Sequence, residues 1–403
     1  MAHVLIVGAG PAGASLAHLL AHRGIEVTLL ERQRDFAREF RGEFLMPSGV
    51  DALAQMGLGE SLAAVPSYTL EAGAFYLNGR LVFSAELDAA SQEDRPPRAV
   101  SQPGLLEMLV AEADKSPHFR LERGASVKEL LVEGGRVVGV RARSEDGEHD
   151  LRADLVVGAD GRGSAVRRRG GLTARKLGTP MDIVWCKLPC PESWPGVRFY
   201  AGRGHLLAGY HTWDDSLQLG WVILKGTFGD LRSKGIEQWV EEMANHVSPD
   251  FAAHLRAHAE TARNPFLLST LSDCVERWSS PGLLVIGDAA HTMSPVGGQG
   301  INIALRDAIV AANRLVPVLS GPALDPGRLD AALRAIEEER MREVGVIQRL
   351  QAKPPKLLLS RAWWGEPVRR ALAALLSRER VRERLGGRAG AFTTGITDVR
   401  LSV

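Results

Sequence analysis

A stretch of glycines with one aspartate, residues 287–302, has the composition of a ligand-binding turn. It follows the apolar run 283–286, which predicts a buried strand, and it precedes residues 301–315, whose apolar side chains recur at helical spacing. Glycines let backbone N–H groups approach a ligand closely, and the start of a helix offers N–H groups to an anion. Asp288 can accept hydrogen bonds from ligand hydroxyls. We therefore expect a ligand site here; an ordinary strand–loop–helix with glycines in tight turns is the alternative.

A second glycine-rich turn lies close to the amino terminus. The first expected strand is followed by Gly8-x-Gly10-x-x-Gly13, a helix-forming run and a second strand that ends at Glu31. In this setting the glycines allow the turn, the approach of the backbone to a pyrophosphate and the packing of the helix on the strand, while the acid accepts ribose hydroxyls. The pattern predicts a dinucleotide site, with a generic βαβ unit as the alternative. Arg32 either lines the adenosine part of this site or is a solvated loop charge.

A third strand end has a related composition. The buried run 155–158 leads into Asp160-Gly161. The carboxyl ends of parallel strands are the side of an open α/β sheet on which ligands bind, so Asp160 is a third candidate for the same site. A plain Asp-Gly turn is the alternative.

Residues 180–272 differ in composition from the segments around these turns. Most of the tryptophans and tyrosines lie there, in runs that predict strands, and helix-like runs follow at 236–246 and 251–260. We expect an antiparallel sheet with two helices, in a lobe separate from the nucleotide-binding segments. Its aromatic side chains either form the wall of a pocket for a flat organic ligand or belong to the core.

Two helical segments are expected near the carboxyl terminus. The first covers residues 329–351, and the second is an amphipathic segment at about 367–385 that is rich in arginine. Because glutamates alternate with these arginines, the pattern favours a solvated helix face over a site for a polyanion. Residues from Gly386 onward carry little signal.

The overall composition is that of an ordinary globular protein. A length of 403 residues allows two or three domains, and a net charge of +1 gives no sign of nucleic-acid binding or of an anionic membrane surface. The three cysteines do not have zinc-ligand spacing, so we expect no metal site and a reducing, cytoplasmic setting. A strand begins almost at once, so we expect no signal peptide. No uncharged apolar run reaches the roughly 18 residues of a membrane span.

Taken together, the three motifs resemble the group A flavoprotein monooxygenases, the para-hydroxybenzoate hydroxylase-like family of FAD enzymes. The resemblance covers about residues 3–315 and rests on Gly8-x-Gly10-x-x-Gly13 with Glu31, on Asp160-Gly161-x-x-Ser164-x-x-Arg167, and on Gly287-Asp288-Ala289-Ala290-His291 with Pro295. It implies an α/β fold with a Rossmann-like FAD-binding domain, an antiparallel-sheet substrate domain and C-terminal helices. The expected segments are 1–70, 96–178 and 275–320 for FAD binding, 71–95 and 179–274 for the substrate domain, and 321–403 for the helical region.

The resemblance also implies which residues contact the cofactor. The glycines of the first turn would bind the FAD pyrophosphate, Glu31 the ribose and Asp288 the ribityl chain. Pro295 and Gly297–Gly300 would lie against the isoalloxazine ring, where the start of a helix can stabilise the negative charge of the reduced flavin. The complete set of expected cofactor-binding residues is Gly8, Gly10, Pro11, Ala12, Gly13, Glu31, Arg32, Arg41, Gln102, Asp160, Asp288, Pro295, Gly298, Gly300, Ile301 and Asn302.

The implied reaction uses FAD, NAD(P)H as co-substrate and O2. Hydride from NAD(P)H would reduce FAD, O2 would form a C4a-hydroperoxyflavin, and one oxygen atom would hydroxylate or epoxidise an aromatic or polycyclic small molecule. No catalytic side chain is assigned. By residue type alone, four residues could act as a general base: His205, Tyr210, His211 and His291. For each of them a structural role is the alternative. The choice between NADH and NADPH stays open, as does a homodimer.

Other functions are compatible with parts of this pattern. An FAD-dependent reductase or oxidase would use the same fold, and a non-catalytic flavin or ligand-binding protein would bind FAD without oxidising NAD(P)H. The Trp-x-Trp-x-Ile-Pro segment of flavin halogenases is missing at the nearest candidate, Gly220–Leu224. The strand ends at Asp160 and Asp288 argue against a plain NAD-dependent dehydrogenase.

Overall fold

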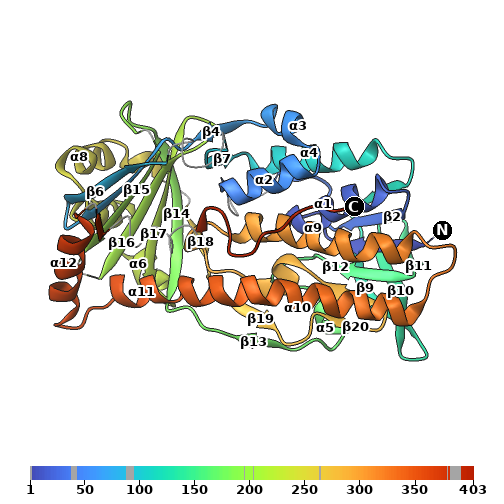
Figure 1. Cartoon of the computed structure of the whole chain (residues 1–403). Coiled ribbons are helices and arrows are strands. Elements are labelled where there is room, and N and C mark those ends of the chain that lie inside the picture. Colours follow the sequence, from blue (N-terminus) through green and yellow to red (C-terminus); the bar gives the residue numbers. More distant parts are fainter. Residues whose placement is uncertain are drawn as a thin grey trace.

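The computed structural model describes residues 2–37, 43–87, 95–194, 196–202, 204–262, 265–378, 380–381 and 392–403. These residues form two large sheets that lie side by side, with one long helix running past both (Figure 1). Arg41, one of the expected cofactor contacts, lies outside the described residues.

The first sheet has six strands in the order β20-β21-β12-β1-β2-β8. The four pairings from β21 to β8 are parallel, and only β20 pairs in antiparallel orientation. The inner strands β1, β12 and β21 are short and mostly apolar, as expected for a covered parallel sheet, whereas β2 and β8 also carry charged residues. Their bounds are β1 His3–Val7, β2 Glu26–Glu31, β8 Phe119–Arg123, β12 Leu155–Gly158, β20 Ser279–Ser280 and β21 Leu283–Val285.

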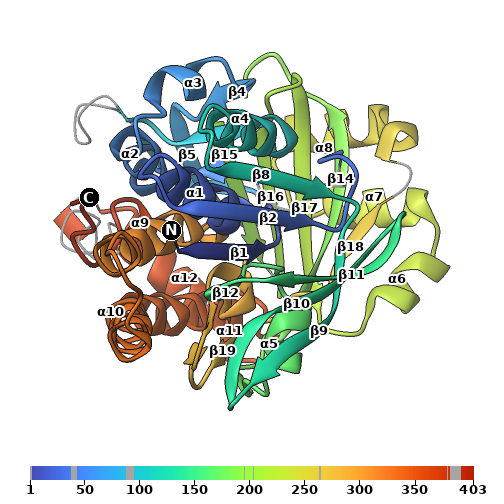
Figure 2. The same cartoon turned by 90° about the vertical axis from the view of Figure 1, so that its right-hand side faces the viewer.

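Helices cover one face of this sheet and a meander covers the other (Figure 2). The helices are α1 Pro11–Ala21, α4 Gln102–Asp114 and α9 Gly300–Leu319, with α10 Pro326–Gln351 packed outside α9. The meander consists of β9 Ser126–Glu133, β10 Arg136–Ser144 and β11 Gly147–Arg152. The predicted nucleotide-binding topology is therefore confirmed.

The second sheet has seven strands in the order β18-β14-β17-β16-β15-β5-β6. All neighbours are antiparallel except β15 and β5. A tight turn at Asn78-Gly79 joins β5 to β6, and both residues have positive φ, of 51° and 74°. The strand bounds are β5 Ala72–Leu77, β6 Arg80–Glu86, β14 Met181–Pro189, β15 Gly196–Gly202, β16 His205–His211, β17 Ser216–Leu224 and β18 Phe266–Leu268.

The two faces of this second sheet have different partners because side chains alternate along each strand. On β14, Val184 and Cys186 point into a core with the helices α6 Phe228–Ser233, α7 Ile236–Ala244 and α8 Pro249–Ala257. Ile183 and Trp185 point the opposite way, into a smaller apolar cluster that also contains Phe44. The predicted antiparallel lobe is confirmed, with one short helix more than expected.

Short strands and helices complete the fold. Two three-stranded sheets have the orders β3-β7-β4 and β13-β19-β22. Their strands are β3 Phe44–Leu45, β4 Ser67–Thr69, β7 Arg98–Val100, β13 Ala174–Lys176, β19 Asp273–Val275 and β22 His291–Thr292. The short helices are α2 Pro47–Gln55, α3 Gly59–Ala63, α5 Ala165–Arg169, α11 Lys353–Leu358 and α12 Gly365–Leu376, with 3-10 turns η2 Ala259–Ala262 and η3 Gly287–Ala289.

The carboxyl-terminal elements agree only partly with expectation. The predicted helix at 329–351 is α10, which begins three residues earlier. The final predicted helix is α12, which ends at Leu376, and residues 382–391 lie outside the described part. The tail 392–403, which carried little signal in the sequence, packs against the core through Phe392, Val399 and Leu401.

Candidate active site

One cavity of about 450 Å³ opens at the carboxyl ends of the central strands of the six-stranded sheet. This volume is typical of ligand pockets, which span about 300–1,000 Å³. All three expected motifs reach it, although more than 270 residues separate the first from the last. The expected site residues that line it are Gly8, Gly10, Pro11, Ala12, Glu31, Arg32, Gln102, Asp160, Asp288, Pro295, Gly298, Gly300 and Ile301.

The three glycines of the first turn have different physical roles. Gly8 has a φ of +103°, and a Cβ there would lie 2.5 Å from the Ala159 carbonyl oxygen. A Cβ on Gly13 would lie 2.0 Å from the Gly8 oxygen. Gly10, at the start of α1, would direct its Cβ into space with no described atom within 4 Å. The structure thus needs Gly8 and Gly13 for packing, whereas Gly10 keeps the cavity open at a helix N-terminus.

Glu31 is held in place at the end of β2. Its side chain is 4% exposed and accepts hydrogen bonds from the backbone N–H groups of Ala9, at 3.0 Å, and Gln33, at 2.9 Å. These bonds orient the Glu31 carboxylate at a position that lines the cavity.

The carboxylate of Asp160, which was expected to contact the cofactor, bonds groups of the protein itself. It accepts from the backbone N–H groups of Ala165, at 2.6 Å, and Val166, at 3.2 Å, and from the Ser164 hydroxyl, so it caps α5. The group that this loop directs toward the third motif is Arg162, whose Nε donates to Asp288 Oδ2 at 3.2 Å. Arg162 and Arg168 both line the cavity, and sequence reasoning did not select either of them.

The Gly287–Ala289 turn is anchored from behind by a buried carboxylate. Asp307 of α9 accepts from the Gly287 N–H at 2.9 Å and is bonded to His291 Nε2 at 2.7 Å. Its other oxygen accepts from Arg340 Nε of α10 at 2.7 Å. His291 is 1% exposed and does not line the cavity, so its observed contacts are those of a structural residue.

The same network continues through α10 toward the carboxyl terminus. Glu343 is bonded to Arg340 and Arg306 and accepts from the Ile396 N–H at 2.9 Å. Burial alone would raise the pKa of Asp307 and of Glu343. His291 and Arg340 instead lower the pKa of Asp307 to about 2. Arg340 and Arg306 lower the pKa of Glu343 to about 2. These buried charges fix the positions of the glycine turn, α9 and α10 relative to one another.

The loop before α9 is also held from outside the cavity. Asn302 is fully buried, and its amide bonds the backbone of Met46, at 2.9 Å, Gly298, at 2.8 Å, and Phe44, at 3.3 Å. Asn302 therefore lies behind the cavity wall, as Gly13 does, and positions the residues that form it. Gln299 adds a second support because its Nε2 donates to the Phe392 carbonyl oxygen at 2.7 Å.

The end of the cavity next to the seven-stranded sheet is apolar. It is lined by Phe44, Trp185, Leu268 and Met293. Trp185 and Leu268 belong to the seven-stranded sheet, whereas Phe44 lies in β3 and Met293 directly follows β22. A ligand in this part of the cavity would therefore contact the seven-stranded sheet and these short segments.

The four candidate bases do not line this cavity in the described structure. His205 stacks on His246 at 4.2 Å, and burial lowers the pKa of His205 to about 4. His211 stacks on Tyr68 at 3.7 Å. Tyr210 is fully buried, with its ring 4.4 Å from that of Phe44.

Behind Phe44, the Tyr210 hydroxyl donates to the buried carboxyl group of Glu43 at 3.2 Å. Burial raises the pKa of Glu43 to about 7, although Lys187 and the hydrogen bond from Tyr210 oppose that rise. Sequence reasoning did not select Glu43, because its burial depends on the seven-stranded sheet, which lies far away in the sequence.

Glu43→Gln should change how stability depends on pH. The pKa of Glu43 is about 7 in the folded protein and 4.5 ordinarily, so the folded state binds the proton more tightly. The difference between 4.5 and about 7 corresponds to about 3.5 kcal/mol at about 1.4 kcal/mol per pKa unit. This stability is fully present below pH 4.5 and is lost as pH rises through 7. Glutamine stays neutral, so the variant should gain stability over the parent across this window, measured by urea unfolding. Glu133→Gln is the control, since Arg152 lowers the pKa of that exposed carboxyl group. A constant difference between Glu43→Gln and the parent would contradict the expectation.

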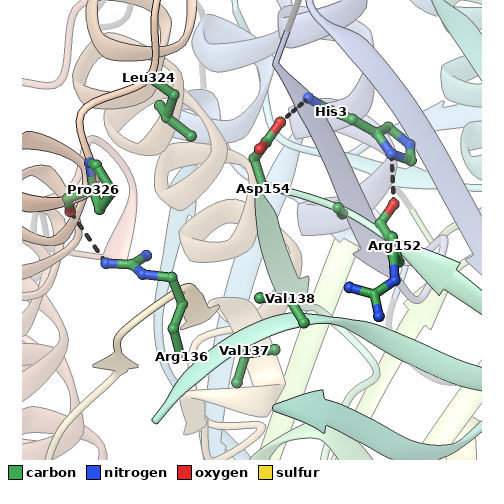
Figure 3. Close-up of a pocket in the computed structure, with 9 residues that line it drawn as sticks. His3, Arg136, Val137, Val138, Arg152, Asp154, Leu324 and Pro326 are labelled. Atoms are coloured by element: carbon green, nitrogen blue, oxygen red, sulfur yellow. Dashed lines mark hydrogen bonds between the residues drawn. The ribbon is translucent and has the colours of Figure 1, made fainter. Parts of the chain in front are cut away.

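A second cavity lies at the far edge of the meander, between β10 and the start of α10 (Figure 3). Its polar groups bond to one another: His3 Nδ1 to the Arg152 carbonyl oxygen at 2.9 Å, and Arg136 to the Pro326 carbonyl oxygen at 3.3 Å. None of the three motifs reaches it among the described residues. We therefore place the chemistry in the first cavity.

The described residues set two further limits. They contain no group of three or more His, Cys, Asp or Glu side chains that could hold a metal ion. None of their helices has both the length and the apolar character needed to cross a bilayer.

A parallel sheet with a glycine-rich first turn, and a cavity at its carboxyl edge, defines a nucleotide-cofactor-binding α/β protein. Comparison with known proteins specifies the class. Residues 1–340 match the FAD binding domain family. The 6-methylpretetramide 4-monooxygenase of Streptomyces rimosus is 33% identical over 378 residues, which cover 93% of this chain and 88% of that protein.

Solved structures have the same fold. PqsL of Pseudomonas aeruginosa, in complex with 2-aminobenzoylacetate, matches with a TM-score of 0.79 at 22% identity, over 89% of this chain and 97% of that one. The p-nitrophenol 4-monooxygenase PnpA of Pseudomonas putida DLL-E4 also has a TM-score of 0.79, at 18% identity, over 99% of this chain and 100% of that one. The chain belongs to the FAD-binding family of flavoprotein monooxygenases and is an oxidoreductase.

The residues around the cavity fit FAD. Besides Gly10, the glycines at 161, 163 and 300 would direct a Cβ into space with no described atom within 4 Å, and all four line the cavity. The open space therefore follows a path of bare backbone from the first turn past the Asp160 loop to the start of α9. A long cofactor with a pyrophosphate needs such close approach of backbone N–H groups.

Proposed function

We propose that this enzyme uses NAD(P)H and O2 to hydroxylate or epoxidise an aromatic or polycyclic small molecule. The observation that carries the proposal is the continuity of the cavity, which runs from the nucleotide-binding turn at Gly10 to the apolar wall of Phe44 and Trp185. When bound, FAD supplies the redox chemistry, taking a hydride from NAD(P)H and activating O2 at its C4a atom for transfer of one oxygen atom.

The chain's own residues would bind and orient the reactants. Gly10 and the N-terminus of α1 would hold the pyrophosphate, and Glu31 the adenosine ribose. Asp288, fixed by Arg162 at 3.2 Å, would accept the ribityl hydroxyls. The backbone at Gly298 and Gly300 would direct N–H groups toward the negative charge of the reduced ring.

The apolar residues at the other end would exclude water and hold a flat substrate. Phe44, Trp185 and Leu268 offer aromatic and aliphatic surface with few hydrogen-bonding groups, which suits an aromatic ring. Residues 1–70, 96–178 and 275–320 would then form the FAD-binding domain, residues 71–95 and 179–274 the substrate domain, and residues 321–403 the helical region. The relative from Streptomyces rimosus is named for oxygenation of 6-methylpretetramide, which supports this substrate class.

The proposal is tested by a substrate screen with the FAD-loaded protein. Phenols, hydroxyquinolines and polyketide-like aromatics are each added with NADH or NADPH, and cofactor oxidation, oxygen uptake and product mass are measured. We expect at least one compound to stimulate NAD(P)H oxidation and to yield a product heavier by one oxygen atom. Stimulated oxidation with an unchanged or dehydrogenated substrate would instead show a reductase or oxidase. Bound FAD without any NAD(P)H oxidation would show a non-catalytic flavoprotein.

A further inference from the structure

Helix α12 presents its apolar side chains to solvent. Trp364, Val368, Ala371 and Leu375 recur at the spacing of one helix face, and all four are exposed. Trp364, Val368 and Leu375 are 45%, 42% and 47% exposed, and Trp363, just before the helix, is 88% exposed. A surface helix of a globular protein ordinarily turns such a stripe toward the core, so the orientation of α12 needs an explanation.

Polar contacts on the opposite side fix this orientation. Arg369 is 4% exposed and donates to the carbonyl oxygens of Ser360, at 2.8 Å, and Leu357, at 3.2 Å, and it pairs with Glu366 at 3.0 Å. Glu366 in turn accepts from Asn78 at the tip of the β5–β6 hairpin. Rotating α12 to bury its stripe would break these bonds and leave Arg369 without its partners. The apolar face is therefore held outward by the fold.

The helix lies at one end of the molecule, beside the seven-stranded sheet and far from the six-stranded one (Figure 1). The chain segment that contains the helix is strongly basic. Residues 353–381 contain seven basic and two acidic residues, whereas the whole chain has a net charge of +1. The exposed basic residues of this segment are Lys353, Lys356, Arg361, Arg370, Arg378 and Arg380.

We propose that this α12 face, Trp363 to Leu375 with its flanking basic residues, docks on the surface of an anionic phospholipid bilayer. An interfacial helix buries an apolar stripe at the boundary of headgroups and acyl chains, with Lys and Arg at the phosphates. Tryptophan favours this boundary, since its ring is apolar and its N–H can bond to water or headgroups. The helix has 12 residues and lies along the surface rather than across the bilayer.

The positive charge of this surface favours a membrane over a second copy of the chain as the binding partner. Two copies that met through α12 would bring two basic surfaces together, and like charges across an interface oppose association. An anionic surface instead neutralises them. In the sequence, the alternation of glutamates with arginines beyond residue 378 favoured a solvated face; the exposed stripe, which only the structure shows, changes that interpretation. The docking surface does not depend on the cofactor or on the substrate.

The test uses the full-length, FAD-loaded protein with vesicles. Sedimentation is measured with phosphatidylcholine vesicles and with vesicles that also contain phosphatidylglycerol. We expect binding to the anionic vesicles, a blue shift of tryptophan fluorescence, and weaker binding at high salt. Trp363→Ser combined with Trp364→Ser should lower the partition coefficient by about tenfold or more. Val132→Ser, on β9, is the matched control because Val132 is 57% exposed but lies far from α12, and it should bind like the parent.

Charge variants and oligomeric state complete the test. Arg361→Gln and Arg378→Gln should each weaken binding to anionic vesicles by about fivefold without changing the melting temperature. Failure of the parent to bind anionic vesicles would overturn the proposal, as would unchanged binding of the double tryptophan variant. Light scattering that shows a dimer lost in the tryptophan variant, with no vesicle binding, would assign the stripe to a second copy instead.

Discussion

Replacing Arg340 with methionine should lower the free energy of unfolding by about 3–5 kcal/mol. Arg340 is fully buried between α9 and α10, where it bonds Asp307 at 2.7 Å and also bonds Glu343. Methionine has a similar length but no charge, so two buried carboxylates lose a common partner. Denaturant unfolding of the apoprotein measures the loss.

Arg314→Met is the matched control, since Arg314 and Glu339 join the same two helices at 2.7 Å. Their side chains are 50% and 37% exposed, so this pair should contribute less than about 1 kcal/mol. The parent should also lose stability as pH falls from the ordinary carboxyl pKa values near 4 toward 2, since the pKa values of Asp307 and Glu343 are lowered to about 2. Equal losses for Arg340→Met and Arg314→Met would show that the buried network does not stabilise the fold.

Gly10→Val should lower FAD affinity by about 100-fold or more while the apoprotein stays folded. A side chain at Gly10 meets no described atom within 4 Å and projects into the cavity, so it competes with the cofactor and not with the protein. Gly10 also has a φ of −73°, which valine can adopt. A 100-fold loss corresponds to about 2.7 kcal/mol, a modest cost for steric overlap with a phosphate. Titration of the apoprotein with FAD gives the affinity, and the melting temperature reports the fold.

Two other glycines make the comparison decisive. Gly59→Val adds the same side chain at the start of α3, also with no described atom within 4 Å, and should leave FAD affinity unchanged. Gly13→Val should instead destabilise the apoprotein, since its Cβ would lie 2.0 Å from the Gly8 oxygen. If Gly10→Val bound FAD as tightly as the parent, the pyrophosphate would not lie at this turn.

The buried network and the glycine turn are parts of one arrangement. Asp307 fixes Gly287, and the same loop places Asp288 next to Arg162 at the cavity. A loss of Arg340 should therefore also loosen the proposed ribityl contact. The conformationally free glycine turn at the cavity is therefore held in position by the buried charged residues behind it.

Local patterns in the sequence were sufficient for the strands and helices that carry the three motifs, and for the convergence of these motifs. Gly8, Gly10 and Glu31 could be selected because a strand–turn–helix–strand unit is short and its geometry depends on neighbours in the chain. Asp160 and Asp288 could be added because parallel strands end at a common edge. The sequence by itself therefore determined the FAD-binding topology and the family.

Only the tertiary structure decided which side chains face the cavity and which support it. Asp160 caps α5, and Asn302 bonds Met46, 256 residues away. Glu43 acquires its raised pKa, and Phe392 its place behind Gln299, through contacts with segments that are remote in the sequence. Periodicity and turn composition describe only neighbours along the chain. The burial, the charge partners and the outward stripe of α12 arise when distant segments pack together, because packing sets which groups lose water and which charges lie within a few ångströms.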